Sequence, residues 1–184
     1  MKVYLIRHAR TVDAEKGVHQ RNDTPILFEG LKQDLFTGLK PGKVYSSPLL
    51  RARQTAEILF RDYEIIEYIH EFIRPKLLNG KLQEEGRLFW KKHLPVLRDN
   101  PDWKYDGCES FNEIKARTKK FLIFLESLPY KSVAVVSHGT FFRYLVGVHK
   151  FGENFTFPFY EKEIMNIKWE NLECREIEIK LKNK

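Results

Sequence analysis

Two short apolar runs dominate the hydrophobic pattern of the 184-residue chain. Residues 2–6 and 133–136 are rich in valine, leucine and isoleucine, and polar residues bound each run. Segments of this kind are too short for helices and are typical of strands buried on both faces of a parallel sheet. Shorter apolar runs or alternating patterns predict four more strands, at 43–46, 64–68, 163–169 and 173–181.

Between these strands the apolar residues take up helical spacing. Residues 48–61 begin with a proline, which suits a first helical turn, and continue with a stripe of leucine, alanine and phenylalanine. Residues 110–128 open with a capping-box pattern, Ser110 followed three positions later by Glu113. Residues 141–148 form a third helical segment. Strands alternating with helices predict an α/β fold, a three-layer sandwich with a mainly parallel central sheet flanked by helices.

One stretch interrupts the alternation. Residues 72–106 contain three prolines and two glycines, which favour loops and short helices over regular strands. We expect this segment to be an insertion that lies over one edge of the sheet. No internal repeat or long linker divides the chain, so residues 1–184 are predicted to form a single domain.

The composition is that of an ordinary globular protein, with 42% apolar residues. The chain enters its first strand directly after Met1 and Lys2, without the apolar region and cleavage site of a signal peptide. No apolar run is long enough to span a membrane. Cys108 and Cys174 match neither zinc-binding nor redox spacing. We therefore expect a reduced, cytoplasmic protein with no membrane partner.

The formal net charge of +7 raises the question of nucleic-acid binding. Much of the excess is lysine scattered along the chain and at its C-terminal end. No basic stripe alternates with aromatic residues as it does in proteins that bind single strands. We therefore expect no nucleic-acid partner, and a charge that solvates the surface and attracts a small anionic substrate.

A histidine follows each of the two buried strands. The first strand leads into Arg7 and His8, and the later one leads into His138 and Gly139. Open α/β folds bind ligands at the edge where the carboxyl ends of parallel strands meet. Gly139 would let the backbone approach a ligand closely, and the helix start after it offers N–H groups to an anion.

A third basic element lies between these two. Segment 45–56 runs from a short strand into a helix whose first turn carries Arg51. Together with Arg7, it could hold phosphate oxygens through forked hydrogen bonds. A single histidine at a strand end is usually a structural residue. Three basic elements at one sheet edge favour a site for a phosphate group.

Three motifs follow one another along the chain: Arg7-His8, the element Ser-Pro-Leu-x-Arg-Ala-x-Gln-Thr-Ala at 47–56, and Ser-His-Gly at 137–139. In this order they resemble the histidine phosphatase superfamily. That family includes cofactor-dependent phosphoglycerate mutases, the phosphatase half of bifunctional fructose-bisphosphate enzymes, α-ribazole phosphatases and phosphohistidine phosphatases. The match covers residues 2 to about 150. It implies a phosphoglycerate mutase-like fold, a covalent phosphohistidine intermediate, and neither a metal nor another cofactor.

The resemblance also assigns the central roles. His8 would be the nucleophile, and Arg7, Arg51 and His138 would hold the phosphoryl group. The chemistry agrees, because a neutral imidazole can attack phosphorus when its other nitrogen is held in a hydrogen bond. Two arginines and a second histidine would match the charge of the transferring group without a metal ion.

The leaving oxygen needs a proton, which relatives supply from a carboxylic acid on a loop after the third strand. Glu71, within residues 68–75, resembles that position and is the candidate general acid. We expect apolar neighbours to raise its pKa. Glu109 lies in Gly107-Cys108-Glu109-Ser110, where relatives often have Gly-Glu-Ser. It is the rival proton donor, a helper that contacts substrate, or simply a charge that suits a helix start.

Weaker matches give further candidate substrate contacts. Thr11 and the Gly139 backbone are two of them, and Gln20 is a third. Gln20 belongs to segment 18–25, which resembles the next mutase motif only in part because Arg21 replaces a glycine.

Other departures favour a phosphatase over a mutase. Relatives commonly have glycine and then glutamate or glutamine after Arg-His, where this chain has Ala9 and Arg10. The mutases have asparagine where it has Ala14, and they are longer. We therefore expect a phosphatase whose partner is a small phosphorylated metabolite. A phosphoglycerate-type mutase and a non-catalytic phosphoester-binding protein are the alternatives.

The motifs do not identify the substrate. We expect residues 72–106 to cover the active site and, with residues 151–162, to set specificity. Aromatic residues in these segments either line the substrate pocket or, as is commoner, pack in the core. They are Phe89, Trp90, Trp103, Phe155, Phe157 and Phe159.

Overall fold

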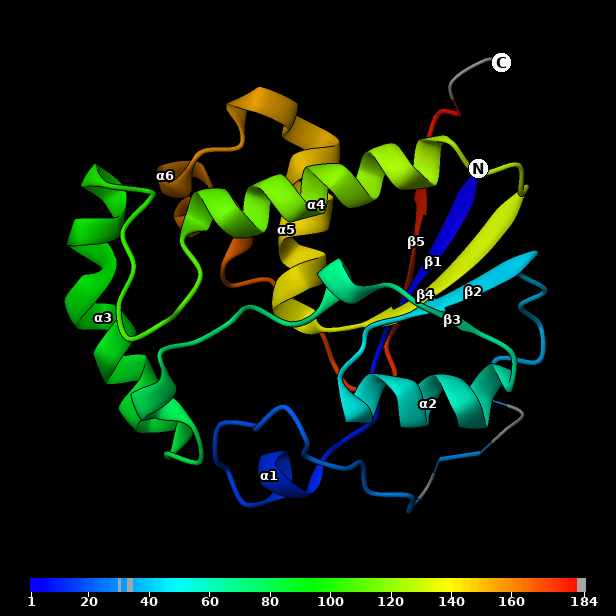
Figure 1. Ribbon diagram of the computed structural model, residues 1–184, viewed down its shortest axis with the longest axis horizontal. Coiled ribbons are helices and arrows are strands. Elements are labelled where there is room, and N and C mark those ends of the chain that lie inside the picture. The colour runs from blue at the N-terminus through cyan, green and yellow to red at the C-terminus, as the bar shows by residue number, and fades with distance from the viewer. Residues whose placement is uncertain (30, 33–34, 182–184) are drawn as a thin grey trace.

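The computed structural model describes residues 1–29, 31–32 and 35–181. At its centre is a five-stranded sheet with strand order β3-β2-β4-β1-β5 (Figure 1). The strands are β1 (Lys2–Arg7), β2 (Lys43–Ser46), β3 (Glu64–Ile65), β4 (Ser132–Ser137) and β5 (Cys174–Glu178). All neighbours pair in parallel except β5, which runs antiparallel to β1. The mainly parallel sheet predicted from the sequence is confirmed.

Helices cover both faces of this sheet. Helix α2 (Leu50–Phe60) lies on one face, and α4 (Phe111–Glu126) and α5 (Gly139–Phe151) lie on the other (Figure 1). The remaining α-helices of the described residues are α1 (Val12–Glu15), α3 (Gln83–Asp99) and α6 (Phe157–Phe159). Short 3-10 turns are found at Glu67–Ile69, Lys76–Leu78 and Gly152–Asn154, and a π-helical turn at Tyr160–Ile164. The three-layer sandwich is confirmed.

Side-chain alternation along β1 and β4 explains why helices pack on both sides. Val3, Leu5 and Val135 belong to the core beneath α4 and α5. Ile6 and Val136 belong to the smaller core beneath α2. Because β4 lies in the middle of the sheet, both of its faces are covered, and this is why its sequence reads as a continuous apolar run.

Helix starts follow local signals where these are strong. At the start of α4, the Ser110 hydroxyl accepts a hydrogen bond from the Glu113 N–H at 3.1 Å. The Glu113 carboxylate accepts one from the Ser110 N–H at 2.9 Å in return. The predicted capping box is therefore present and fixes the first residue of the helix.

One predicted strand is wrong and two are shorter than expected. The strand predicted at 173–181 is β5, which covers only Cys174–Glu178. Residues 163–169 form the end of the π-helical turn and a loop, not a strand. Ile164 and Trp169 are buried there against the α4–α5 layer, so their spacing reflects burial without sheet pairing. The strand predicted at 64–68 ends at Ile65, because the chain turns almost at once into a 3-10 helix.

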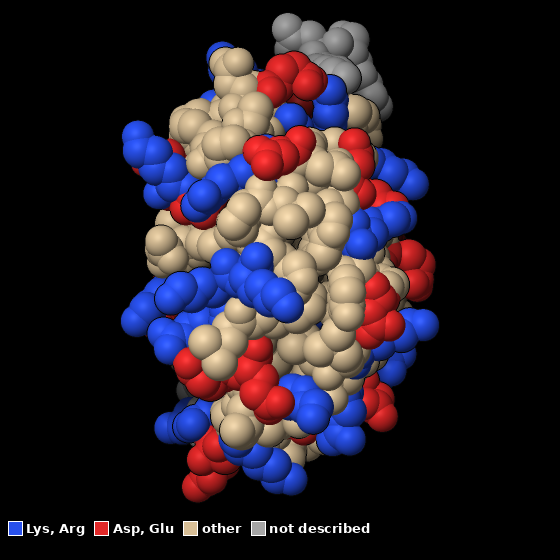
Figure 2. All heavy atoms as spheres, turned by 90° about the vertical axis from the view of Figure 1, so that its left-hand side faces the viewer, with Lys and Arg blue, Asp and Glu red and all other residues tan. Residues whose placement is uncertain are grey.

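Helix α3 stands apart from the sheet, on the side toward which the parallel strands run (Figure 1). It continues through Pro95. Near its first turns, Gly86 lies so close to His19 that a Cβ there would fall 1.8 Å from the ring Nε2. Near its end, Arg98 forms a two-bonded ion pair with Glu161, each bond 2.6 Å long. From this side, a strip of uncharged surface runs down the face, and lysine and arginine side chains reach its middle from the left (Figure 2).

Two further features bear on the expectations from composition. Cys108 and Cys174 are both free thiols. In the part of the chain that the structure describes, no helix combines the length and apolar character needed to cross a membrane.

Candidate active site

The two predicted histidines meet at the carboxyl ends of β1 and β4. The parallel register places Arg7 opposite Ser137, so the residues that follow each of them leave the sheet side by side. The rings of His8 and His138 lie with their centroids 5.1 Å apart. Both side chains are buried. The fold therefore brings together the two histidine motifs that lie far apart in sequence.

The His8 ring is held in one orientation and one tautomer. Its Nδ1 lies 2.7 Å from the backbone oxygen of Ala9, and because a carbonyl can only accept, Nδ1 carries the proton. Nε2 is left with its lone pair. Burial, and then the nearby charges of Arg51 and Arg7, hold the pKa of His8 well below its usual value. A neutral imidazole with a fixed Nε2 lone pair is the form that attacks phosphorus.

His138 is also neutral, and one of its nitrogens has a defined partner. Its Nε2 and the Ser47 hydroxyl are 2.7 Å apart. Burial, followed by the charge of Arg51, holds the pKa of His138 well below its usual value. Its Nδ1 is buried and has no hydrogen-bond partner within the described residues.

Two buried arginines accompany the histidines. The Arg51 Nη1 donates to the backbone oxygen of Arg21 at 3.1 Å, and the Arg7 Nη1 donates to that of Trp169. The Nε atoms of Arg7 and Arg51 are buried without a partner in the described residues. Burial lowers the pKa of Arg51 to about 10, which still leaves it a cation at neutral pH. Buried cations with unpaired N–H groups form a site that favours an anion.

The sequence element at 47–56 also has a structural role. The Thr55 hydroxyl accepts a hydrogen bond from the Ala9 N–H at 3.0 Å and donates to the Arg51 backbone oxygen at 2.7 Å. The Gln54 side chain accepts from the Ile26 N–H at 3.0 Å. Helix α2 thus fixes the loop that follows His8, in addition to supplying Arg51.

The loop after β1 contains a predicted residue and one that the sequence did not reveal. The buried Thr11 hydroxyl caps helix α1, so its side chain organises the loop. Asp13 is 3% exposed and accepts from the N–H of Arg21 and the hydroxyl of Thr24. It therefore holds the turn whose carbonyl binds Arg51. A lone aspartate in a short helix gives no sequence signal for this role.

Gly139 and Gln20 are the remaining predicted substrate contacts. A Cβ at position 139 would lie 3.6 Å from the Arg7 Nε and 3.5 Å from the Trp169 Cβ. These are ordinary van der Waals distances, so the protein itself leaves room for a Cβ here, and the contact of the Gly139 backbone with substrate stays a prediction. Gln20 is half-buried in the loop after α1, and its contact with substrate stays a prediction.

Glu71 lies at the start of helix α5. Its carboxylate accepts hydrogen bonds from the N–H groups of Phe72, Phe141 and Thr140, at 2.8, 3.2 and 3.4 Å. The N–H groups predicted to bind an anion at this helix start therefore bind a carboxylate of the protein itself. This arrangement places Glu71 close to His138 along helix α5, and its role as general acid stays a prediction.

The expected direction of the Glu71 pKa is wrong. Burial by itself would raise the pKa of this carboxyl group, but Arg74, the Phe72 N–H, Arg51 and Arg7 together outweigh it and lower the pKa below its usual value. Arg74 was not singled out from the sequence. Its charge also acts on the His8 pKa, and only its place three residues after Glu71 could have drawn attention to it.

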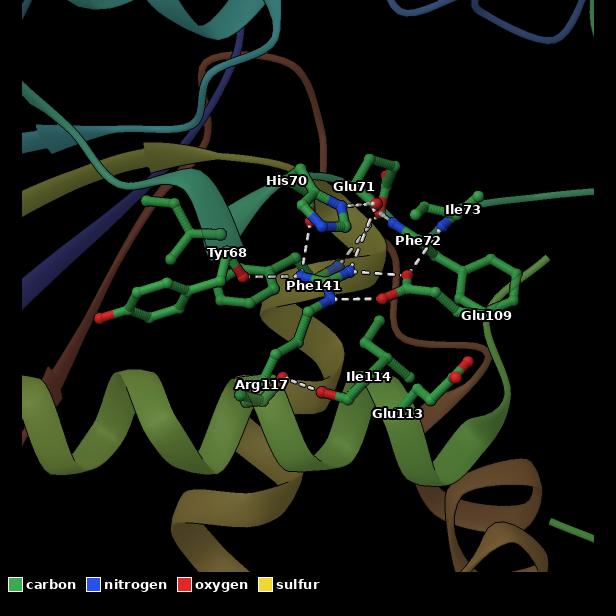
Figure 3. Close-up of polar contacts among 12 residues, drawn as sticks. Tyr68, His70, Glu71, Phe72, Ile73, Glu109, Glu113, Ile114, Arg117 and Phe141 are labelled. Atoms are coloured by element: carbon green, nitrogen blue, oxygen red, sulfur yellow. Dashed lines mark hydrogen bonds and ion pairs between the residues drawn. The ribbon is translucent and has the colours of Figure 1, made fainter. Parts of the chain in front are cut away.

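A buried ion pair supports the Glu71 loop from helix α4 (Figure 3). Arg117 binds Glu109 through two hydrogen bonds, of 2.6 and 2.9 Å, and both side chains are about nine-tenths buried. Glu109 also accepts from the Ile73 N–H at 2.9 Å. Arg117 further donates to three backbone oxygens of the loop, those of Tyr68, His70 and Glu71. The Glu109 carboxylate is thus engaged in holding the loop.

Among the residues that the structure describes, no group of three or more His, Cys, Asp or Glu side chains is placed to hold a metal ion.

The chain is similar to several known proteins. The sequence profile of the histidine phosphatase superfamily (branch 1) matches residues 3–181. A Schizosaccharomyces pombe protein named as a phosphatase is 29% identical over 148 residues, 77% of this chain and 49% of that protein, so the chain spans about half the length of that relative. A Hydrogenobacter thermophilus protein named as a phosphoserine phosphatase is 29% identical over 75% of this chain and 73% of its own length. The crystal structure of a phosphoglycerate mutase from Thermus thermophilus has a TM-score of 0.62 and 28% identity, over 85% of this chain and 87% of that one.

Proposed function

Because the chain belongs to the histidine phosphatase superfamily, we propose that it hydrolyses a small phosphomonoester through a covalent phosphohistidine on His8, without a metal ion. The state of His8 carries the proposal. Its imidazole is buried and neutral, Nδ1 is bonded to Ala9, and the lone pair of Nε2 is free. The relatives named as phosphatases support hydrolysis as the outcome.

In the first step the phosphoryl group lies among Arg7, Arg51 and His138. The His8 Nε2 forms a bond to phosphorus while the bond from phosphorus to the leaving oxygen breaks. The two guanidinium groups match the charge on the phosphoryl oxygens, which is the role a magnesium ion has in other phosphoryl-transfer enzymes. The leaving oxygen takes a proton from Glu71 and departs as an alcohol.

For this step Glu71 must carry a proton, although its pKa is lowered in the free protein. Besides Arg74, the arginines that lower it are Arg51 and Arg7, the two that face the phosphoryl group. A bound phosphate dianion offsets their charge at Glu71 and so raises the pKa of that carboxyl group. Substrate binding thus prepares the acid, and the carboxylate returns to its ionised form after donating the proton.

In the second step water attacks phosphohistidine. Glu71, now a carboxylate, takes a proton from the water as its oxygen bonds to phosphorus. The bond between phosphorus and the His8 Nε2 breaks, which releases inorganic phosphate and restores the neutral imidazole. Each step uses the same carboxyl group in the opposite direction, so one turnover leaves the site unchanged.

The test is phosphate release by the purified protein. We expect inorganic phosphate from p-nitrophenyl phosphate, phosphoserine or another monoester, and none from a His8→Ala variant whose circular dichroism matches the wild type. Conversion of 3-phosphoglycerate to 2-phosphoglycerate without phosphate release would establish the mutase alternative. Binding of phosphomonoesters without turnover of any of them would establish the non-catalytic alternative.

A further inference from the structure

A cavity of about 560 Å³ lies between α3 and the layer formed by α4, α5 and residues 157–165. Cavities that enclose a whole small-molecule ligand have volumes of about 300–1,000 Å³. Helix α3 contributes one face to the wall, with side chains that recur at helical spacing: Arg87, Leu88, Trp90, Lys91, Leu94 and Leu97. The space beneath α3 is therefore large enough to receive more than a phosphate group.

The wall of this cavity is mainly apolar and aromatic. From the sequence, six aromatic residues could either line a substrate pocket or pack in the core. Of these, Trp90, Trp103 and Phe157 line the cavity. Phe155, by contrast, is fully buried in the core. Trp90 is held by an edge-on contact with Phe72, 5.8 Å between ring centroids. Rigid aromatic walls of this kind favour an apolar or aromatic ligand.

One end of the cavity adjoins the catalytic cluster. Thr140 lines the cavity, and its N–H donates to the Glu71 carboxylate. Arg74 lines it as well, and the charge of Arg74 lowers the pKa of His8. A ligand in the cavity would therefore reach the residues that handle the phosphoryl group.

The charge of the wall is positive. Its cations are Arg74, Lys91, Arg143 and Arg87, of which Arg87 is already paired with Glu84 at 2.6 Å. Its carboxylate, Glu109, is already paired with Arg117. Figure 2 shows lysine and arginine side chains beside the uncharged middle of the face that α3 covers. An apolar cavity with unbalanced positive charge suits an anion with a bulky apolar body, and a neutral ligand would leave that charge unmatched.

We propose that this cavity holds the alcohol part of the substrate, and that the substrate class is phosphomonoesters of bulky aromatic or apolar alcohols. The proposal rests on the function proposed above, because it places the phosphate at His8 and the body of the ester beneath α3. Small polar esters such as phosphoserine would leave the Trp90 side of the cavity unfilled.

The first experiment compares phenyl phosphate with biphenyl-4-yl phosphate, whose leaving groups are phenols of similar acidity. Burial of the second ring should raise kcat/KM roughly 10- to 100-fold. Similar kcat/KM values for the two esters, or a preference for phosphoserine over both, would overturn the assignment. Phosphate release from these esters would still support the proposed function.

Two variants on α3 make the comparison specific. Leu88 lines the cavity and is 56% exposed, and Val96 lies on the same helix outside the cavity wall and is 41% exposed. Neither substitution removes core packing, so both variants should fold. Leu88→Glu should lower kcat/KM for the biphenyl ester about tenfold, because it places a carboxylate against the apolar ring. Val96→Glu should change it less than about twofold. Equal effects of the two would contradict the proposal.

A binding measurement separates this proposal from the proposed function. In the His8→Ala variant, which cannot form phosphohistidine, biphenyl-4-yl phosphate should change the fluorescence of Trp90 and Trp103 with saturation. Phenyl phosphate should bind at least about tenfold more weakly. If the wild type releases no phosphate but this difference holds, the cavity assignment stands and the catalytic proposal fails. If phosphate is released but no difference appears, the cavity assignment fails alone.

Discussion

The ion pair between Arg117 and Glu109 allows a quantitative test of how the Glu71 loop is held. Its side chains are 10% and 9% exposed, and Arg117 also binds three loop carbonyls. Arg117→Met keeps most of the volume but leaves the Glu109 carboxylate buried with one N–H donor, from Ile73. Breaking a buried pair from one side costs about 3–5 kcal/mol. We expect a loss of that size in the free energy of unfolding.

The double variant Arg117→Met/Glu109→Gln removes the unpaired charge as well. It should lose only about 1–3 kcal/mol, for the loop carbonyls left without a donor. Urea denaturation followed by circular dichroism gives the free energy of unfolding of Arg117→Met, Glu109→Gln and the double variant. The coupling energy between the two positions should be about 2 kcal/mol or more. Arg98→Met is the matched control. It breaks a two-bonded arginine–glutamate pair in which Arg98 is 51% exposed, and should cost less than about 1 kcal/mol.

A loss of unfolding free energy in Arg117→Met no larger than in Arg98→Met would show that the pair does not hold the loop. So would a loss in the double variant equal to the sum of the losses in the two single variants. The activity of the folded variants adds a second readout. Because Arg117 touches the loop backbone and lies outside the phosphoryl cluster, its loss should reduce kcat for an alkyl phosphate more than for p-nitrophenyl phosphate. A change confined to KM would indicate that the loop binds substrate but does not position the acid.

Three further predictions concern the chemistry of the site. Glu71→Gln should slow phosphohistidine formation from an alkyl phosphate about 10²–10⁴-fold but should hardly slow it from p-nitrophenyl phosphate. Glu109→Gln should affect the two esters alike. The reverse pattern would make Glu109 the acid. Excess chelator should leave activity intact, and recovery of lost activity on adding magnesium or zinc would refute metal independence. Because the folded-state pKa values of His8 and His138 lie below 6.5, their contribution to stability is complete above pH 6.5 and is lost as pH falls below it. The free energy of unfolding should therefore fall between pH 7 and pH 5.5, by up to about 1.4 kcal/mol per pH unit for each histidine, and the urea midpoint should fall with it. A constant midpoint would contradict this.

Local sequence signals predicted the parts of the fold that depend on local physics. The continuous apolar runs of β1 and β4 indicated strands covered on both faces, and the Ser110 capping box indicated the start of α4. Because parallel strands end at one edge, two strand-end histidines were expected to meet there. The 5.1 Å between the rings of His8 and His138 agrees with that expectation.

The features that the sequence did not predict depend on tertiary contacts. The chain has 32 lysines and arginines, and no local pattern distinguishes Arg74 or Arg117 from the rest. The pKa of Glu71 was expected to rise because its sequence neighbours are apolar, but the groups that lower it include Arg7 and Arg51 from distant segments. Residues 163–169 alternate like a strand because single side chains reach the core from a helical turn and a loop.

If the phosphoryl group passes through His8, the phosphohistidine intermediate can be trapped. The protein is mixed briefly with ³²P-labelled substrate, quenched in alkaline denaturant, and digested for mass spectrometry. We expect base-stable, acid-labile label on the peptide that contains His8, and none in a folded His8→Ala variant. Label on the peptide that contains His138, or label that persists in His8→Ala, would contradict it.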